Sequence, residues 1–130
     1  MNPLQMQIIT HYRQKITDEQ SKLERASGDV ERLRNEFQEV IQRVIESELT
    51  AKKSKLFEEN SQFYKLVGPT LTPMKKAEVD TEITGRLSIL KNSATQIEKN
   101  MKEASEAAKS AREQLAYLQV EFRSALQKVQ

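Results

Sequence analysis

Residues 83–129 read ITGRLSILKNSATQIEKNMKEASEAAKSAREQLAYLQVEFRSALQKV, and apolar residues recur along this segment in alternating steps of three and four. No member of the series is polar. A mean spacing of about 3.5 residues is typical of helices that wrap around each other along a narrow seam. A protein of this kind has no globular interior in which to build an active site. The series comprises Ile83, Leu87, Leu90, Ala94, Ile97, Met101, Ala104, Ala108, Ala111, Leu115, Leu118, Phe122, Ala125 and Val129.

The first part of the chain repeats the pattern with only two polar members, Glu19 and Ser47. Asn2 suits an N-cap, and Pro3 suits the first helical position, where its missing N–H costs nothing. The pattern therefore predicts a first helix over residues 3–60 and a second helix over residues 76–130. The first series is Tyr12, Ile16, Glu19, Leu23, Ala26, Val30, Leu33, Phe37, Val40, Val44 and Ser47.

Residues 61–74 break the helical period and predict a β-hairpin. The segment is SQFYKLVGPTLTPM, in which the aromatic and β-branched residues favour strand and Gly68-Pro69 is a turn signal. Pro73 cannot donate to a strand ladder, so it marks the end of the second strand or a sheet edge.

A short insert between two helices of similar length predicts an antiparallel arrangement. A parallel homodimer would have to interrupt its seam in the middle. The predicted fold class is therefore mainly α: a long antiparallel two-helix coiled coil with one β-hairpin at the bend. We expect a single domain over residues 1–130.

Side-chain volume predicts the register of the two helices. Folding the chain about residue 70 opposes Leu33 to Ala108 and Val30 to Ala111, so that large residues face small ones. In this register residues 1–10 project past the end of the second helix. Four apolar side chains would then lack a partner in the chain, which predicts an interaction surface unless the terminus is simply frayed. They are Leu4, Met6, Ile8 and Ile9.

The predicted hairpin has apolar residues on both faces. Phe63, Lys65 and Val67 alternate with Tyr64 and Leu66. An isolated two-stranded hairpin is marginally stable in water, and its two edges invite pairing with another chain. Since one chain supplies only two strands, we expect other subunits to supply the rest of the sheet.

Composition narrows the possible functions. The chain has 130 residues, of which 37% are hydrophobic and 31% charged, and its net charge is +2. Mixed charges argue against nucleic-acid binding, which usually needs a basic patch. Cysteine is absent, and neither a membrane-spanning run nor a signal peptide is recognisable. We expect a cytoplasmic protein that does not bind membranes.

The sequence contains no catalytic, cofactor-binding or metal-binding motif. His11 is the only histidine and points away from the seam, and the Glu58-Glu59 pair lies on an exposed helix without a pocket. Glu19 occupies a seam position, where a charged residue can fix the register. We therefore expect a non-enzymatic protein without cofactors.

The insert and its flanks resemble a β-class prefoldin subunit over nearly the whole chain. The single hairpin fits the β class, since α-class subunits have two. The residues that resemble the family are Phe63-Tyr64-Lys65-Leu66-Val67-Gly68-Pro69 with Leu71, then Gly85-Arg86-Leu87, Ser27-Gly28 and the closing segment from Leu115 to Phe122.

The resemblance implies a hetero-hexamer of two α-class and four β-class subunits whose hairpins form an intersubunit β-barrel. Family members hold unfolded chains, with actin and tubulin as familiar clients, and pass them to the cytosolic group II chaperonin without ATP. The residues that would join the barrel are Phe63, Tyr64, Lys65, Leu66, Val67, Gly68, Pro69 and Leu71. The client-binding tip would consist of Leu4, Met6, Ile8, Ile9, Phe122, Leu126 and Val129.

Two other interpretations remain open. A structural or tethering coiled-coil adaptor would use the insert only to join its helices, but such a connector would be short and polar. An antiparallel tRNA-binding arm would need more positive charge than this chain has.

Overall fold

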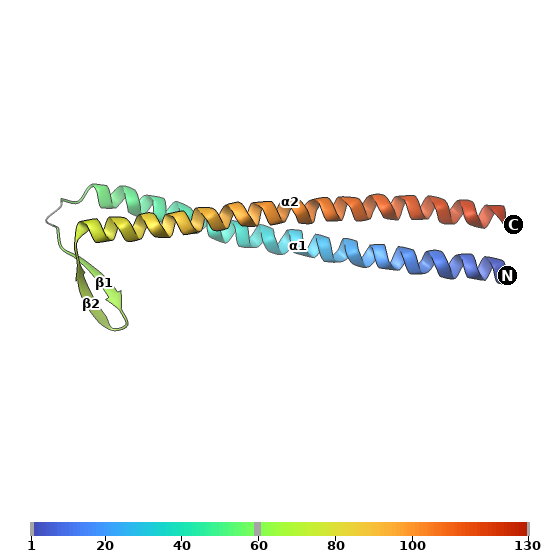
Figure 1. Ribbon diagram of the computed structural model, residues 1–130, viewed down its shortest axis with the longest axis horizontal. Coiled ribbons are helices and arrows are strands. Elements are labelled where there is room, and N and C mark those ends of the chain that lie inside the picture. Colours follow the sequence, from blue (N-terminus) through green and yellow to red (C-terminus); the bar gives the residue numbers. More distant parts are fainter. Residues whose placement is uncertain (1, 59–60, 130) are drawn as a thin grey trace. The chain divides into compact units, whose positions relative to one another are not determined.

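The computed structural model describes residues 2–58 and 61–129 and contains two long helices separated by two strands (Figure 1). The elements are α1 (Pro3–Lys55), β1 (Phe63–Val67), β2 (Thr70–Met74) and α2 (Lys76–Lys128). The predicted fold class, mainly α with one antiparallel hairpin between two helices, is confirmed. The chain divides into two compact units, one made of residues 1–34 and 99–130 and the other of residues 35–98.

In the first unit the seam lies where the heptad spacing predicts it. Every predicted seam position in this unit is buried or half-buried. Most of the buried residues are alanines, and small side chains let two helices approach closely. The buried residues of this unit are Ala26, Leu33, Ala108, Ala111 and Leu118.

The helix register in the first unit departs from the predicted one by about a heptad at Tyr12 and by less further along, where Ala26 and Ala111 line one groove and Val30 and Ala108 another. The rings of Tyr12 and Phe122 lie with their centroids 5.4 Å apart, whereas the predicted register opposed Tyr12 to residue 129, one heptad further on. Alanine recurs in heptad after heptad of α2, so matching large residues to small ones cannot distinguish registers that differ by one heptad. The two aromatic rings are the bulkiest groups near this end, and their contact belongs to the observed register.

The shifted register shortens the projecting N-terminal segment. Ile8 and Ile9 are half-buried rather than unpartnered, and Leu4 and Met6 remain exposed. The helix is nevertheless capped as expected. The Asn2 side chain accepts a hydrogen bond from the Gln5 backbone N–H at 2.8 Å, and the Asn2 N–H donates to the Gln5 side chain at 3.2 Å. This reciprocal capping box fixes the start of α1.

In the second unit the seam continues through Val44 and Ala94 to a buried serine. Ser54 is 4% exposed, and its hydroxyl donates to the Asp80 carboxylate at 2.7 Å. Nearby, Lys91 forms an ion pair with Glu48 at 3.4 Å. These contacts join the last turns of α1 to the first turns of α2.

Helix α1 ends at Lys55, earlier than the predicted end at residue 60. Residues 59 and 60 lie outside the described part of the chain. The ring of Phe57 meets the ring of Phe63 edge-on, with centroids 5.7 Å apart. This contact draws the chain toward β1, and periodicity alone does not reveal it.

The hairpin forms over the predicted residues. Val67 pairs with Thr70 across a two-residue turn, and the ladder continues to Phe63 paired with Met74. Gly68 has a φ of 60°, and the ring of Pro69 fixes a negative φ, which together match a type II′ turn. Pro73 does not end the second strand, because β2 runs through it to Met74.

The observed register can be tested by cross-linking, because the chain has no cysteine of its own. We expect a variant with Tyr12→Cys and Phe122→Cys to be linked within the molecule by a short bifunctional maleimide. The matched variant with Tyr12→Cys and Val129→Cys should react far less, since it represents the register shifted by one heptad. Shifts in gel mobility and peptide mass spectrometry provide the measurement, and equal linking of the two variants would contradict the register.

Candidate functional site

The structure brings all seven predicted tip residues into the first unit, where the two ends of the chain lie next to each other (Figure 1). We call this set the terminal surface: Leu4, Met6, Ile8, Ile9, Phe122, Leu126 and Val129. Leu4 and Met6 are 52% and 57% exposed, and the other five are half-buried. Of the terminal surface, therefore, only Leu4 and Met6 are exposed, beside five half-buried residues at the end of the seam.

Two further exposed apolar residues in this unit, Tyr117 and Val120, were not predicted. They lie three positions apart on α2, off the seam, and that spacing puts them on one helix face. The signal was present in the sequence as apolar residues outside the heptad positions. The charge of Glu121 and its hydrogen bond raise the pKa of the Tyr117 hydroxyl.

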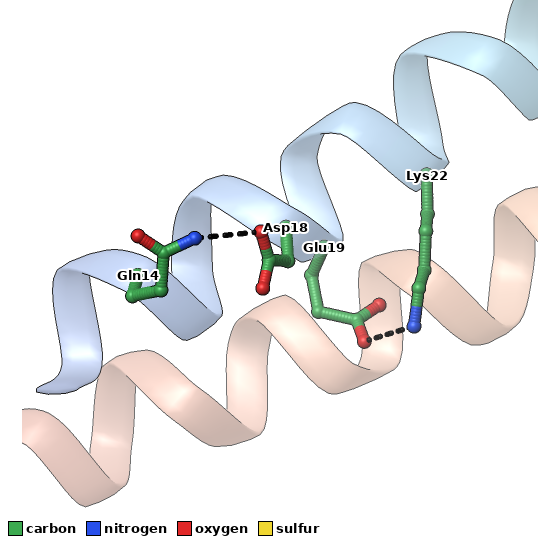
Figure 2. A network of polar contacts seen from close by, with 4 residues as sticks. All are labelled: Gln14, Asp18, Glu19 and Lys22. Atoms are coloured by element: carbon green, nitrogen blue, oxygen red, sulfur yellow. Dashed lines mark hydrogen bonds and ion pairs between the residues drawn. The ribbon is translucent and has the colours of Figure 1, made fainter.

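Polar side chains of α1 border the seam in the same unit (Figure 2). Glu19 occupies its seam position with its side chain mostly covered and forms an ion pair with Lys22 at 3.2 Å. One turn earlier, the Gln14 amide donates to the Asp18 carboxylate at 3.0 Å. Figure 2 shows the Glu19 and Lys22 side chains reaching toward α2 while their charged ends meet. The Glu19 carboxylate at the seam is thus paired with the Lys22 ammonium group. Among the four residues drawn, it has no partner suited to catalysis.

The hairpin in the second unit has two unlike faces. The pairing register puts Tyr64, Leu66, Leu71 and Pro73 on one face, which we call the outer face. Tyr64, Leu66 and Leu71 are 56%, 68% and 62% exposed, and Pro73 is also exposed. The outer face therefore presents two leucines, a proline and the ring of a tyrosine to solvent.

The opposite face fastens the hairpin to the helices of its own unit. Phe63 and Met74 are half-buried, and they line a hollow with Val79 and Ile83 of α2. Lys65 of β1 forms an ion pair with Glu82 of α2. This face is therefore anchored to α2 at its Phe63–Met74 end and through Lys65, while Val67, Thr70 and Thr72 nearer the turn are exposed.

The predicted hairpin residues accordingly divide into groups. Phe63 meets the ring of Phe57 and Lys65 forms an ion pair with Glu82, while Tyr64, Leu66 and Leu71 are mostly exposed. The rest lie at the turn, where Val67 is exposed beside Gly68 and Pro69. The sequence identified the residues, and the pairing register sorts them by face.

The described residues hold no arrangement suited to catalysis at a metal. Within residues 2–58 and 61–129, no three His, Cys, Asp or Glu side chains gather closely enough to bind a metal ion. His11 meets Tyr12 edge-on, with ring centroids 5.2 Å apart. In the same part of the chain, neither helix has an apolar stretch long enough to cross a membrane.

The chain is similar to known proteins in both sequence and structure. A family model described as "Prefoldin subunit" matches residues 17–122. Among solved structures, the chain is similar to the prefoldin beta subunit from Thermococcus strain KS-1, with 18% sequence identity and a TM-score of 0.62. That match covers 86% of this chain and 92% of the Thermococcus chain. No curated protein sequence matches the chain.

The family match includes the hairpin and most of both helices. It begins at residue 17 and ends at residue 122, so of the terminal surface it reaches only Phe122. At 18% identity, the structural similarity concerns the fold.

The buried hydrogen bond between Ser54 and Asp80 predicts a measurable loss of stability. We expect Ser54→Ala to lower the free energy of unfolding by about 1 kcal/mol, because Asp80 would lose a partly buried partner. Ser47→Ala is the matched control, since Ser47 is a half-buried seam serine on the same helix. It should be neutral or slightly stabilising, because Ala favours helix. Urea unfolding of both variants gives the comparison, and indistinguishable midpoints would refute a role for this hydrogen bond.

Proposed function

This chain belongs to the prefoldin family, and on that basis we propose that it is a β-class subunit of an ATP-independent complex that holds unfolded polypeptides. The family is one of non-enzymatic chaperones, and membership implies assembly with other prefoldin subunits. We propose that the assembly is a hetero-hexamer of α-class and β-class subunits. The single hairpin supports the β class.

The observation that most supports this function is the uncovered outer face of the hairpin. An assembly that buries the exposed side chains of Tyr64, Leu66 and Leu71 would be stabilised by several kcal/mol. The contribution is about 1.5–3 kcal/mol for each fully buried side chain. Within residues 2–58 and 61–129, each of these three residues keeps more than half of its surface exposed. A plain connector between two helices gains nothing from such a face, whereas a sheet shared between subunits buries it.

We propose more specifically that this chain is most like prefoldin subunit six. The segment from Phe63 to Pro69 supports that assignment. In this proposal the chain works in the cytoplasm, its clients are unfolded or nascent polypeptides of the actin and tubulin class, and the complex delivers them to the group II chaperonin.

We propose the terminal surface as the client-contacting part of the subunit. Leu4 and Met6 are exposed on a helix whose start is fixed by the capping box of Asn2 and Gln5. Contacts made by a few apolar side chains are non-directional and tolerate different client sequences. They are also weak enough individually to be released, and Met adapts to irregular partners.

The client-holding role can be tested with a double substitution in the assembled complex. We expect Leu4→Ser with Met6→Ser to weaken capture of unfolded actin about tenfold or more, since each buried apolar side chain contributes about 1.5–3 kcal/mol. Light scattering during dilution of denatured actin measures the suppression of aggregation. Deleting residues 1–9 should abolish suppression while leaving assembly intact.

Ile89→Ser is the matched control for this experiment. Ile89 is also an exposed apolar residue, but it lies on α2 in the second unit. The control should keep full holding activity. If the double variant also keeps it in an intact complex, the terminal surface is not the client-binding site.

Assembly itself distinguishes the chaperone subunit from the adaptor alternative. Co-expression with the other prefoldin subunits should give a complex of hexameric mass by size exclusion with light scattering. A chain that stays monomeric beside those subunits, or forms a long filament, would instead support a tethering coiled coil.

A further inference from the structure

We propose that the two edges of the hairpin are not equivalent: a strand from a different subunit pairs chiefly with the β1 edge, because Pro73 weakens the β2 edge. The inference rests on the proposed assembly and adds to it the edge that is used and the chemistry of the strand that fits. It follows from the hairpin register and from one proline.

The register fixes which backbone groups face away from the hairpin. In a hairpin with a two-residue turn, the residues that flank the turn form a hydrogen-bonded pair, and the pairs then alternate with non-hydrogen-bonded ones. Here Val67 and Thr70 flank the turn, so Leu66 with Leu71 and Tyr64 with Pro73 are the non-hydrogen-bonded pairs. Backbone groups of these four residues point outward, toward any strand that would be added.

The two edges differ in the donors that they can offer. On the β1 edge, Tyr64 and Leu66 each present an N–H and a C=O to an added strand. On the β2 edge, Leu71 presents both groups, but Pro73 has no N–H and presents only its C=O. The β1 edge therefore offers two donors and two acceptors, whereas the β2 edge offers one donor and two acceptors.

The same register explains why a proline is tolerated inside β2. Its missing N–H would point outward, so no hydrogen bond within the hairpin is lost. Proline on a sheet edge is a known means of discouraging strand addition. Pro73 thus leaves the hydrogen bonds within the hairpin intact. It lowers the number of hydrogen bonds that the β2 edge can form with an added strand.

Side chains along β1 favour the same edge. Tyr64 and Leu66 both project from the outer face, where they are exposed. A strand beside β1 with apolar residues on that face would extend the outer face and cover both side chains. On β2, Leu71 alone combines an outward-pointing donor with an exposed apolar side chain.

Charge argues against a second copy of this chain as the added strand. An antiparallel pairing of two β1 strands that uses the outward groups of both Tyr64 and Leu66 must be centred on Lys65. It would place the Lys65 residues of the two copies directly opposite each other, and like charges so placed are destabilising. The fitting strand therefore comes from a different subunit, with apolar outer-face residues and no basic residue opposite Lys65.

Proline substitutions at paired positions test the inequality of the edges. Leu66→Pro and Leu71→Pro alter residues that pair with each other, and each removes one outward N–H together with one exposed leucine. In the full-length chain co-assembled with the other prefoldin subunits, Leu66→Pro should weaken association about tenfold, and Leu71→Pro by clearly less. Leu66→Ala, which keeps the N–H, separates the loss of the side chain from the loss of the donor.

Amide exchange of the unsubstituted protein gives a second measurement that does not depend on how the variants fold. The amides of Tyr64 and Leu66 should exchange freely in the isolated chain and slow strongly in the complex. The Leu71 amide should slow less. Equal or stronger protection of Leu71, or an equal effect of the two proline substitutions, would overturn the proposal.

These outcomes are separate from those that test the proposed function. If the unsubstituted chain fails to join the other subunits, the proposed function is wrong. If it joins them and Leu66→Pro is harmless, only the inequality of the edges is wrong.

Discussion

Both helices owe their stability to the burial of one narrow stripe of side chains on each of them. Helices gain most of their stability in proteins from packing rather than from intrinsic propensity, and this applies to two helices of 53 residues each. In the first unit the stripe is rich in alanine, and in the second it ends at the hydrogen bond between Ser54 and Asp80. Because the stripe is narrow, it cannot also cover apolar residues that lie elsewhere on the chain.

Some of the apolar residues outside the stripe form the surfaces that we propose for partner binding. In the second unit they include the outer face of the hairpin, and Lys65 on the opposite face is paired with Glu82. In the first unit they include Leu4 and Met6 beside the end of the seam. One chain thus has an apolar sheet surface suited to a fixed partner and a small apolar group suited to transient contacts. The first suits the assembly with other prefoldin subunits that family membership implies, and the second is the surface that we propose for clients.

Much of the fold could be predicted because its signals are local. The heptad spacing located the seam, and Gly68-Pro69 located the hairpin turn. The end of α1 was placed five residues too late because periodicity does not reveal the contact that Phe57, beyond Lys55, makes with Phe63. The register was missed because recurring alanines make neighbouring heptads alike in volume, whereas the contact between Tyr12 and Phe122 distinguishes them.

Some features of the candidate surfaces likewise follow from the sequence, and others only from the folded structure. The order of residues alone specified which side chains are apolar, where the helical period fails and where a proline removes a backbone donor, since these are properties of single residues and their spacing. Which hairpin face is covered, which edge lacks a donor and how far the N-terminal segment is buried came from three-dimensional packing. Those features depend on pairing between residues distant in the chain, and a difference of one residue in the hairpin or one heptad in the helices changes them without changing any local pattern.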